Sequence, residues 1–367
     1  MPDPSPGSAL RMETHVFDPR RTPPLECDIY GAANYPNDTP LVQTCYFRKW
    51  FLISASYRLL PAVNGRDLLN DATAAYEFAR TRVGGSHIPR RVIVGGASAG
   101  PSFVFCLASS PFPYRNPSAN LPSISSGFFL ATLIAYHLEP KPLALLSITG
   151  IPTFHHPFFN SYKLIYHSSL DPPELVAPNP GPIPEDDMQT LISPYFVGKS
   201  VVEPLDAFAL AKLDSRGKRK HGNAWLWRRL HHVSSSSQPP GVLYNYYLNK
   251  IVYLDLVSAV DPGFDWAASE DDANLARTSQ WPMTIFIQGE QDKDISPSVC
   301  RDVAVRLGSR AVYCEARDQG HLFEKQLFLD NPQLNRGKTK GMSALFKAIK
   351  ALDEAVGTPK ENRIFIK

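Results

Sequence analysis

The sequence carries little charge, and no large excess of either sign. Only 20% of its 367 residues are charged, and the net charge is +3 at pH 7. Nucleic acid is therefore not expected as a partner, because binding it needs a concentrated basic surface. One basic run, Arg216 to His221, is best interpreted as a solvated loop, although a nuclear-import signal or a polyanion site has a similar composition.

Long apolar runs and cysteine motifs are also missing. No stretch reaches the roughly 18 apolar residues that a membrane span requires. The first ten residues, MPDPSPGSAL, lack the apolar core of a secretion signal,. The five cysteines are odd in number and widely spaced, so they match neither a disulfide framework nor a metal site,. We therefore expect a reduced, cytoplasmic protein with no membrane span.

The 43% hydrophobic content is enough for a large α/β domain with an insertion, or for two domains,. Apolar strand-like segments alternate with amphipathic helical ones, which favours a mostly parallel sheet with helices on both faces. The expected strands are 25–30, 50–55, 91–94, 143–148, 281–288 and 311–315, and the expected helices are 67–82, 127–138 and 342–356.

This alternation of strands and helices stops in the middle of the chain. Residues 155–280 are rich in proline, tyrosine and tryptophan, which predicts an inserted lid between two parts of a core, 25–154 and 281–367. Residues 1–24 are expected to form an N-terminal extension. The aromatic side chains of the lid fit packing within the lid itself, or alternatively a pocket for an acyl or aryl group.

Ser98 is the candidate nucleophile. It lies at the centre of Gly-Gly-Ala-Ser-Ala-Gly, residues 95–100, directly after the apolar triplet Val92 to Val94. A strand that runs into G-x-S-x-G forms a sharp, strained turn, where only small neighbours avoid a clash and the serine hydroxyl is exposed above the sheet. The alternative is an ordinary tight turn.

An acid and a base follow two later strands. Asp292 and Asp294 come after the strand TIFIQ, and His321 comes after AVYCEA. Carboxyl ends of parallel strands share one edge of a sheet, so these groups are expected beside Ser98. Singly, each residue fits a turn or a helix cap. Together, in the order Ser, Asp, His, they predict a catalytic triad.

These motifs resemble the α/β-hydrolase superfamily, in particular its esterase and lipase branch related to hormone-sensitive lipase. The resemblance covers roughly residues 25–350 apart from the lid. The matching pieces are SYRLLP at 56–61, the helix from Asp71, GGASAG at 95–100, Gly-Glu-Gln-Asp at 289–292 and Gly320-His321.

The resemblance implies Ser98 as nucleophile, His321 as base and Asp292 as the orienting acid. Asp292 is preferred over Asp294 because the family's acid follows Gly-x-x. Tyr57, Arg58 and Asp71 resemble structural positions. No cofactor or metal is implied, and the partner is a small ester or acyl substrate. Adjacent histidines at 155–156 and 231–232 point in different directions along a chain and lack a suitably spaced carboxylate, so a metal site is not expected there.

The sequence departs from the family at the oxyanion hole. One donor, the backbone N–H of Ala99, is expected. The other donors come from a His-Gly-Gly-Gly-type loop after an upstream strand, but residues 39–42 lead directly into 43–50 with no such loop. Gly84 to His87 is a poor substitute because it precedes a strand. The loop has diverged or has been lost.

The second departure is a surplus block, residues 101–126, between the serine turn and the apolar helix from Gly127. Together, a missing and a surplus block suggest an incorrectly spliced gene model. The alternatives are a degraded enzyme, or a short helix from Pro101 to Val104 followed by a tolerated loop. We expect the block to be poorly packed, with its apolar part, Phe103 to Leu107, lacking a partner. A chain without it, and with the loop restored after Val42, is expected to be faster.

The sequence therefore predicts a serine hydrolase of carboxylic esters or related acyl substrates. A catalytically inactive relative that binds a small hydrophobic ligand or a partner is the alternative. A serine peptidase would share the same two turns, but this length leaves no room for a large substrate-filtering domain.

Overall fold

The structure is a computed structural model. It describes residues 12–21, 24–30, 44–45, 48, 50–58, 60, 63–81, 91–97, 103–108, 127–160, 253–327, 335 and 340–357.

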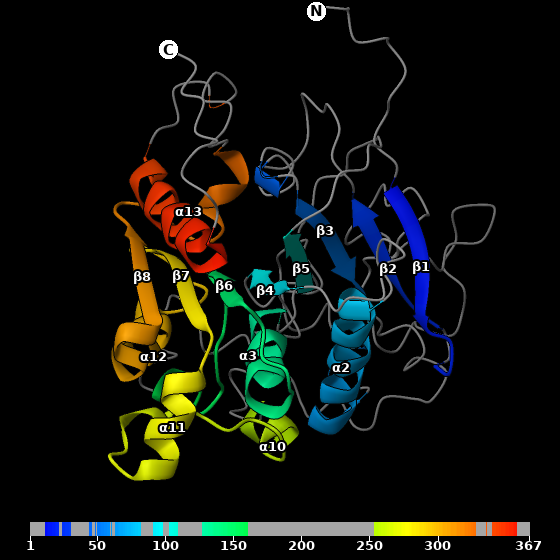
Figure 1. Ribbon diagram of the computed structural model, residues 1–367. Coiled ribbons are helices and arrows are strands. Elements are labelled where there is room, and N and C mark those ends of the chain that lie inside the picture. The colour runs from blue at the N-terminus through cyan, green and yellow to red at the C-terminus, as the bar shows by residue number, and fades with distance from the viewer. Residues whose placement is uncertain are drawn as a thin grey trace, which may run out of the picture.

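The described residues form an eight-stranded sheet with helices on both faces (Figure 1). The strands lie in the order β1-β2-β3-β5-β4-β6-β7-β8. Their bounds are Met12–Asp18 (β1), Leu25–Tyr30 (β2), Trp50–Ala55 (β3), Val92–Ala97 (β4), Phe103–Ala108 (β5), Ala144–Ile148 (β6), Met283–Gly289 (β7) and Ala311–Ala316 (β8).

Strand directions divide the sheet into two halves. β4, β6, β7 and β8 pair in parallel. β2 is antiparallel to β1 and β3, and β5 is antiparallel to β3 and β4. Six of these strands therefore run in one direction, and β2 and β5 run in the other. The four parallel strands, with helices on both faces, confirm the expected α/β fold. The other four neighbouring pairs of the described sheet are antiparallel.

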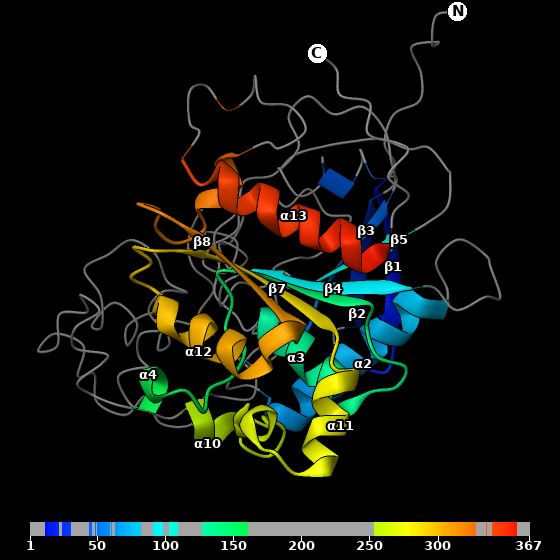
Figure 2. The same cartoon turned by 60° about the vertical axis from the view of Figure 1, so that its left-hand side comes forward.

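Alternating side chains of the strands bury two separate cores. Val92 and Val94 of β4 lie in the core formed with helices α2 (Gly65–Thr81), α3 (Gly127–His137) and α12 (Pro297–Leu307). Ile93, between them, lies in the core formed with α13 (Met342–Val356). The period of two in a strand produces this division. Figure 2 shows α13 on one face of the sheet and the other three helices on the opposite face.

Helix α3 is apolar all round, and it packs against the end of β4. Its residues 127–135 are buried. A Cβ added to Gly96 would lie 2.1 Å from the carbonyl carbon of Gly127, so only glycine allows this close approach,. The amino end of α3 therefore packs against Gly96, although 30 residues separate Gly96 from Gly127 in the sequence. Gly96 lies two residues before Ser98 in the chain.

The expectation for Phe103 to Leu107 is wrong. These residues belong to β5, which lies between β3 and β4 in the sheet, with Phe105 opposite both Ile53 and Val94. A short helix from Pro101 to Val104 is excluded for the same reason. Without β5, the facing edges of β3 and β4 would leave backbone N–H and C=O groups unpaired. The apolar, β-prone segment 103–108 forms hydrogen bonds with both edges,. The prolines of 109–126 lie outside the described residues.

Two further boundaries differ from expectation. β1 falls within the predicted N-terminal extension, but it pairs with β2 along its length. Within the predicted lid, the described parts continue the core: Tyr253 of α10 (Tyr253–Val257) is buried and stacks on Phe154, with ring centroids 4.6 Å apart. Residues 161–252 lie outside the described residues, so the lid stays a prediction.

In the part of the chain that the structure describes, no helix combines the length and the apolar character needed to cross a bilayer.

Candidate active site

The carboxyl ends of four parallel strands meet at one edge of the sheet. Ala97, the last residue of β4, pairs with Ile148 of β6. Ile148 pairs with Ile287 of β7, which in turn pairs with Cys314 of β8. The turns that leave β7 and β8 at this edge carry the predicted acid and base.

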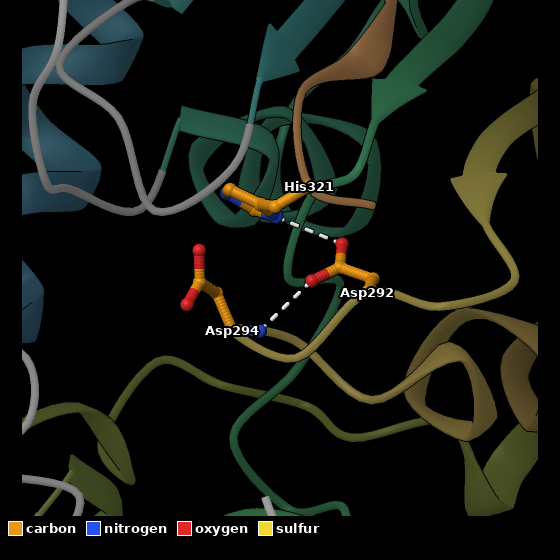
Figure 3. Close-up of side chains that lie close together, drawn as sticks. All are labelled: Asp292, Asp294 and His321. Carbon is orange, nitrogen blue, oxygen red and sulfur yellow. Dashed lines mark hydrogen bonds and ion pairs between the residues drawn. The ribbon is translucent and has the colours of Figure 1, made fainter. Parts of the chain in front are cut away.

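Asp292 and His321 are hydrogen-bonded at this edge. The Nδ1 atom of His321 lies 2.8 Å from Oδ2 of Asp292 (Figure 3). An ionised carboxylate only accepts hydrogen bonds, so Nδ1 carries the proton and donates it. The Asp292 side chain is fully buried, whereas 16% of the His321 side chain is exposed. This contact fixes both the tautomer and the orientation of the imidazole.

The Asp292 carboxylate is held by four hydrogen-bond donors. Its Oδ1 accepts the backbone N–H groups of Asp294 (2.9 Å) and Ile295 (3.0 Å). Its Oδ2 accepts from Gln288 Nε2 (2.8 Å) as well as from His321. Four donors aimed at a buried carboxylate satisfy its oxygens and hold it in one place.

Gln288 was not among the residues predicted for the site. It is fully buried at the end of β7, and its amide also donates to the carbonyl of Ile295. One signal was present: the apolar strand MTIFIQG carries a glutamine next to its last residue. A buried amide needs a polar partner, and here the partner is the carboxylate that orients the base.

The two turns are also joined to each other. A Cβ on Gly289 would lie 2.4 Å from the carbonyl oxygen of Gly320, so the turns approach as closely as glycine permits,. Glu290 accepts the backbone N–H of Asp318 at 3.1 Å. Asp318 and Leu322, on either side of His321, have φ values of 55° and 53°. Such left-handed residues store strain and persist where their surroundings hold them.

The environment raises the pKa of His321. Burial acts to lower this pKa. The hydrogen bond that His321 donates to Asp292, together with the charges of Asp292, Asp294 and Glu324, more than offsets the effect of burial. The pKa of His321 therefore lies above its ordinary value of 6.5. Stabilisation of the charged imidazole is what a general base requires once it has accepted a proton.

Asp294 lies beside this pair. Asp292, Asp294 and His321 each offer a potential metal-ligand atom, all within 4.8 Å of one another. The Asp292 oxygen and Nδ1 of His321 already share a proton across their hydrogen bond, so a cation would have to displace that proton,. The arrangement suits proton transfer better than metal binding.

Arg58 and Asp71, which resemble structural positions of the family, form an ion pair. Asp71 is fully buried in α2, and its two oxygens accept from Nε (2.9 Å) and Nη2 (2.7 Å) of Arg58. The pair ties α2 to the segment after β3. Two parallel hydrogen bonds between a guanidinium and a buried carboxylate fix the orientation of both side chains,.

Ser98 and Ala99 lie outside the described residues, as do 39–42 and 84–87. Ser98 follows Ala97, the last residue of β4, in the chain. The structure thus brings Asp292 and His321 together, at the edge where β4 ends. The role of Ser98 and the backbone donor of Ala99 stay predictions.

No protein-family model matches the chain, and no curated protein matches it. Among solved structures, it is similar to a protein of unknown function from Staphylococcus aureus subsp. aureus Mu50, at 14% identity and a TM-score of 0.45, over 94% of this chain and 98% of that one. An α/β hydrolase superfamily protein from Enterococcus faecalis matches at 11% identity and 0.43, over 93% and 98%.

A thermophilic esterase from the Planctomycetes species Thermogutta terrifontis matches at 14% identity and a TM-score of 0.42, over 95% of both chains. The solved structures similar to this chain thus include members of the superfamily that its motifs resemble. At these identities and TM-scores the similarities carry no argument about activity. The fold class rests on the strand order and the two helical layers.

Proposed function

We propose that the protein is a serine hydrolase that cleaves carboxylic esters or related acyl substrates. The observation that carries the proposal is the hydrogen bond between Asp292 and His321, at the sheet edge where β4 ends one residue before Ser98. A base oriented by a buried carboxylate is the arrangement that activates a serine hydroxyl.

In this mechanism the Ser98 hydroxyl attacks the substrate carbonyl and gives its proton to His321. Since Nδ1 is bonded to Asp292, the proton goes to Nε2,. The imidazolium then protonates the departing alcohol, which leaves an acyl group on Ser98. Water attacks this ester and gives a proton to His321. The imidazolium then protonates the Ser98 oxygen as its bond to the acyl carbon breaks, which releases the carboxylic acid and regenerates Ser98. Asp292 stays ionised and stabilises the imidazolium in both steps.

The developing oxyanion would be stabilised by the backbone N–H of Ala99 and by the amino end of α3. Helix α3 begins at Gly127, against Gly96, and the amino end of a helix carries a partial positive charge,. The loop donors are missing from the sequence between 39 and 50. Because one such donor contributes roughly 10²- to 10³-fold in rate, low turnover is expected.

The same missing loop favours a second candidate, a catalytically inactive protein that binds a small hydrophobic ligand. It would keep the hydrogen bond between Asp292 and His321 as a structural contact. The two candidates differ in whether any turnover depends on Ser98.

The pH dependence of ester hydrolysis tests the proposal. His321 must be neutral to accept the serine proton, and its pKa is raised above 6.5. We therefore expect kcat/KM for 4-nitrophenyl acetate to fall as the pH falls through that raised pKa, with a midpoint above about 6.5. The measurement is a rate profile from about pH 5 to pH 9, with Ser98→Ala as the blank. A midpoint below 6.5, or rates equal to those of the blank, would contradict it.

A further inference from the structure

The two described turns that carry the candidate acid and base are acidic, although the chain as a whole is basic. The turns 289–296 and 317–324 carry five acidic and two basic residues, a net charge of −3, against +3 for the whole chain. The acidic residues are Glu290, Asp292, Asp294, Asp318 and Glu324, and the basic ones are Lys293 and Arg317. A concentration of one sign at a site selects substrates by their charge.

These acids differ in their exposure and in their distance from the imidazole of His321. Asp292 is buried and its charge is taken up by four donors. Asp318 is paired with Lys340 at 3.3 Å, and Glu290 accepts a backbone N–H. Asp294 is exposed, and a carboxylate oxygen of Asp294 lies within 4.8 Å of a ring nitrogen of His321, so its charge is close to the reacting groups.

The position of Asp294 is fixed relative to the base. Its backbone N–H donates to Oδ1 of Asp292, and Oδ2 of the same carboxylate accepts from His321. The next residue, Ile295, is buried and donates to Asp292 as well. Figure 3 shows the Asp294 carboxylate directed toward the imidazole, apart from the Asp292 carboxylate. The turn that orients the base therefore also places this second carboxylate at the site.

We propose that Asp294 determines specificity by favouring neutral and cationic esters over anionic ones. The inference rests on the proposed hydrolase function. An acyl group with its own carboxylate would bring a like charge near Asp294, and an ammonium group would bring the opposite charge. For an exposed carboxylate several ångströms away, each substrate charge is expected to change kcat/KM roughly 3- to 10-fold, less at high salt.

The test compares three 4-nitrophenyl esters with acyl chains of similar length: pentanoate, the half-ester of glutarate, and 4-(trimethylammonio)butyrate. The full chain is assayed as wild type and as Asp294→Asn, at a pH above the midpoint of the rate profile. All three esters use the same base, so a change in the pKa of His321 cancels in the ratios. Asp272→Asn is the matched control, because Asp272 is exposed on α11 (Asp272–Gln280), which precedes β7 and so lies toward its opposite end.

Asp294→Asn is expected to raise the anionic-to-neutral ratio of kcat/KM by roughly 3- to 10-fold and to lower the cationic-to-neutral ratio similarly. Asp272→Asn should leave both ratios unchanged. Unchanged ratios in Asp294→Asn, with hydrolysis still abolished by Ser98→Ala, would overturn the role of Asp294 and leave the proposed function intact. Hydrolysis no faster than that of Ser98→Ala for all three esters would overturn both.

Discussion

Replacement of His321 by alanine is expected to lower kcat/KM for 4-nitrophenyl acetate by roughly 10⁴-fold. The reason is that alanine lacks the imidazole that accepts the serine proton and that Asp292 orients. The fold should survive, because the Asp292 carboxylate keeps donors from Gln288 and two backbone N–H groups. The measurement is steady-state hydrolysis, with the thermal unfolding midpoint as a check of folding.

His15→Ala is the matched control for this experiment. His15 lies on β1, at the end of the sheet opposite β8, where its ring contacts Phe78 with centroids 5.9 Å apart. Its replacement should leave kcat/KM within about twofold. A similar loss of activity in both variants would show that the rate follows general stability, and a fully active His321→Ala would exclude His321 as the base.

Replacement of Phe105 by proline is expected to destabilise the protein by about 3 kcal/mol or more. Phe105 lies opposite Ile53 in β3 and Val94 in β4, so β5 connects the two halves of the sheet. Proline removes a backbone donor and does not fit a central strand. Urea unfolding measures the effect, and hydrogen exchange of 52–54 and 92–95 should rise in the variant.

Phe105→Val provides the comparison, because valine keeps the backbone N–H and the preference for strands. We expect it to be clearly more stable than Phe105→Pro. Equal stability of the two variants would mean that residues 103–108 contribute no strand to the sheet. For the same reason, deletion of 101–126 is not expected to give a faster enzyme as we predicted from the sequence, because the deletion would remove β5.

Several elements could be predicted from the sequence because their patterns are local. The predicted bounds of β2, β3 and α13 agree with the structure. An alternating segment such as LECDIY, an apolar run such as WFLISA and an amphipathic stretch with a repeat of three to four can each be recognised within one segment,. Helix α12 was missed although Ser296 followed by Pro297 is a typical helix start,.

β5 could not be predicted in the same way. The segment FVFCLA is as apolar as a strand, but its place depends on which distant strand edges lack a partner. The strands expected from the other apolar segments left no evident place for it in the sheet. The pairing of 103–108 with both β3 and β4 depends on long-range contacts that one sequence does not show,.

The residues of the candidate site likewise include some that local motifs predict and some that depend on long-range folding. A Gly-x-x-Asp turn and a Gly-His turn, each after a strand, were enough to predict that Asp292 and His321 lie at one edge of the sheet. In the structure the Nδ1 atom of His321 is hydrogen-bonded to Asp292 and not to Asp294. Gln288 was missed because the partner of a buried amide depends on how the following turn folds back. The proximity of Asp294 to the imidazole depends on that turn as well.

Covalent labelling of Ser98 tests the central claim most directly. A fluorophosphonate reacts with an activated serine, forming an oxygen–phosphorus bond and releasing fluoride. Treated protein is digested with trypsin, and fragmentation of the peptide that contains residues 92–115 locates the added mass. We expect the label on Ser98 in the folded wild type and none in folded His321→Ala. Folded wild-type protein that stays unlabelled, or that carries the label on another serine of this peptide, would contradict the assignment of Ser98 as the nucleophile.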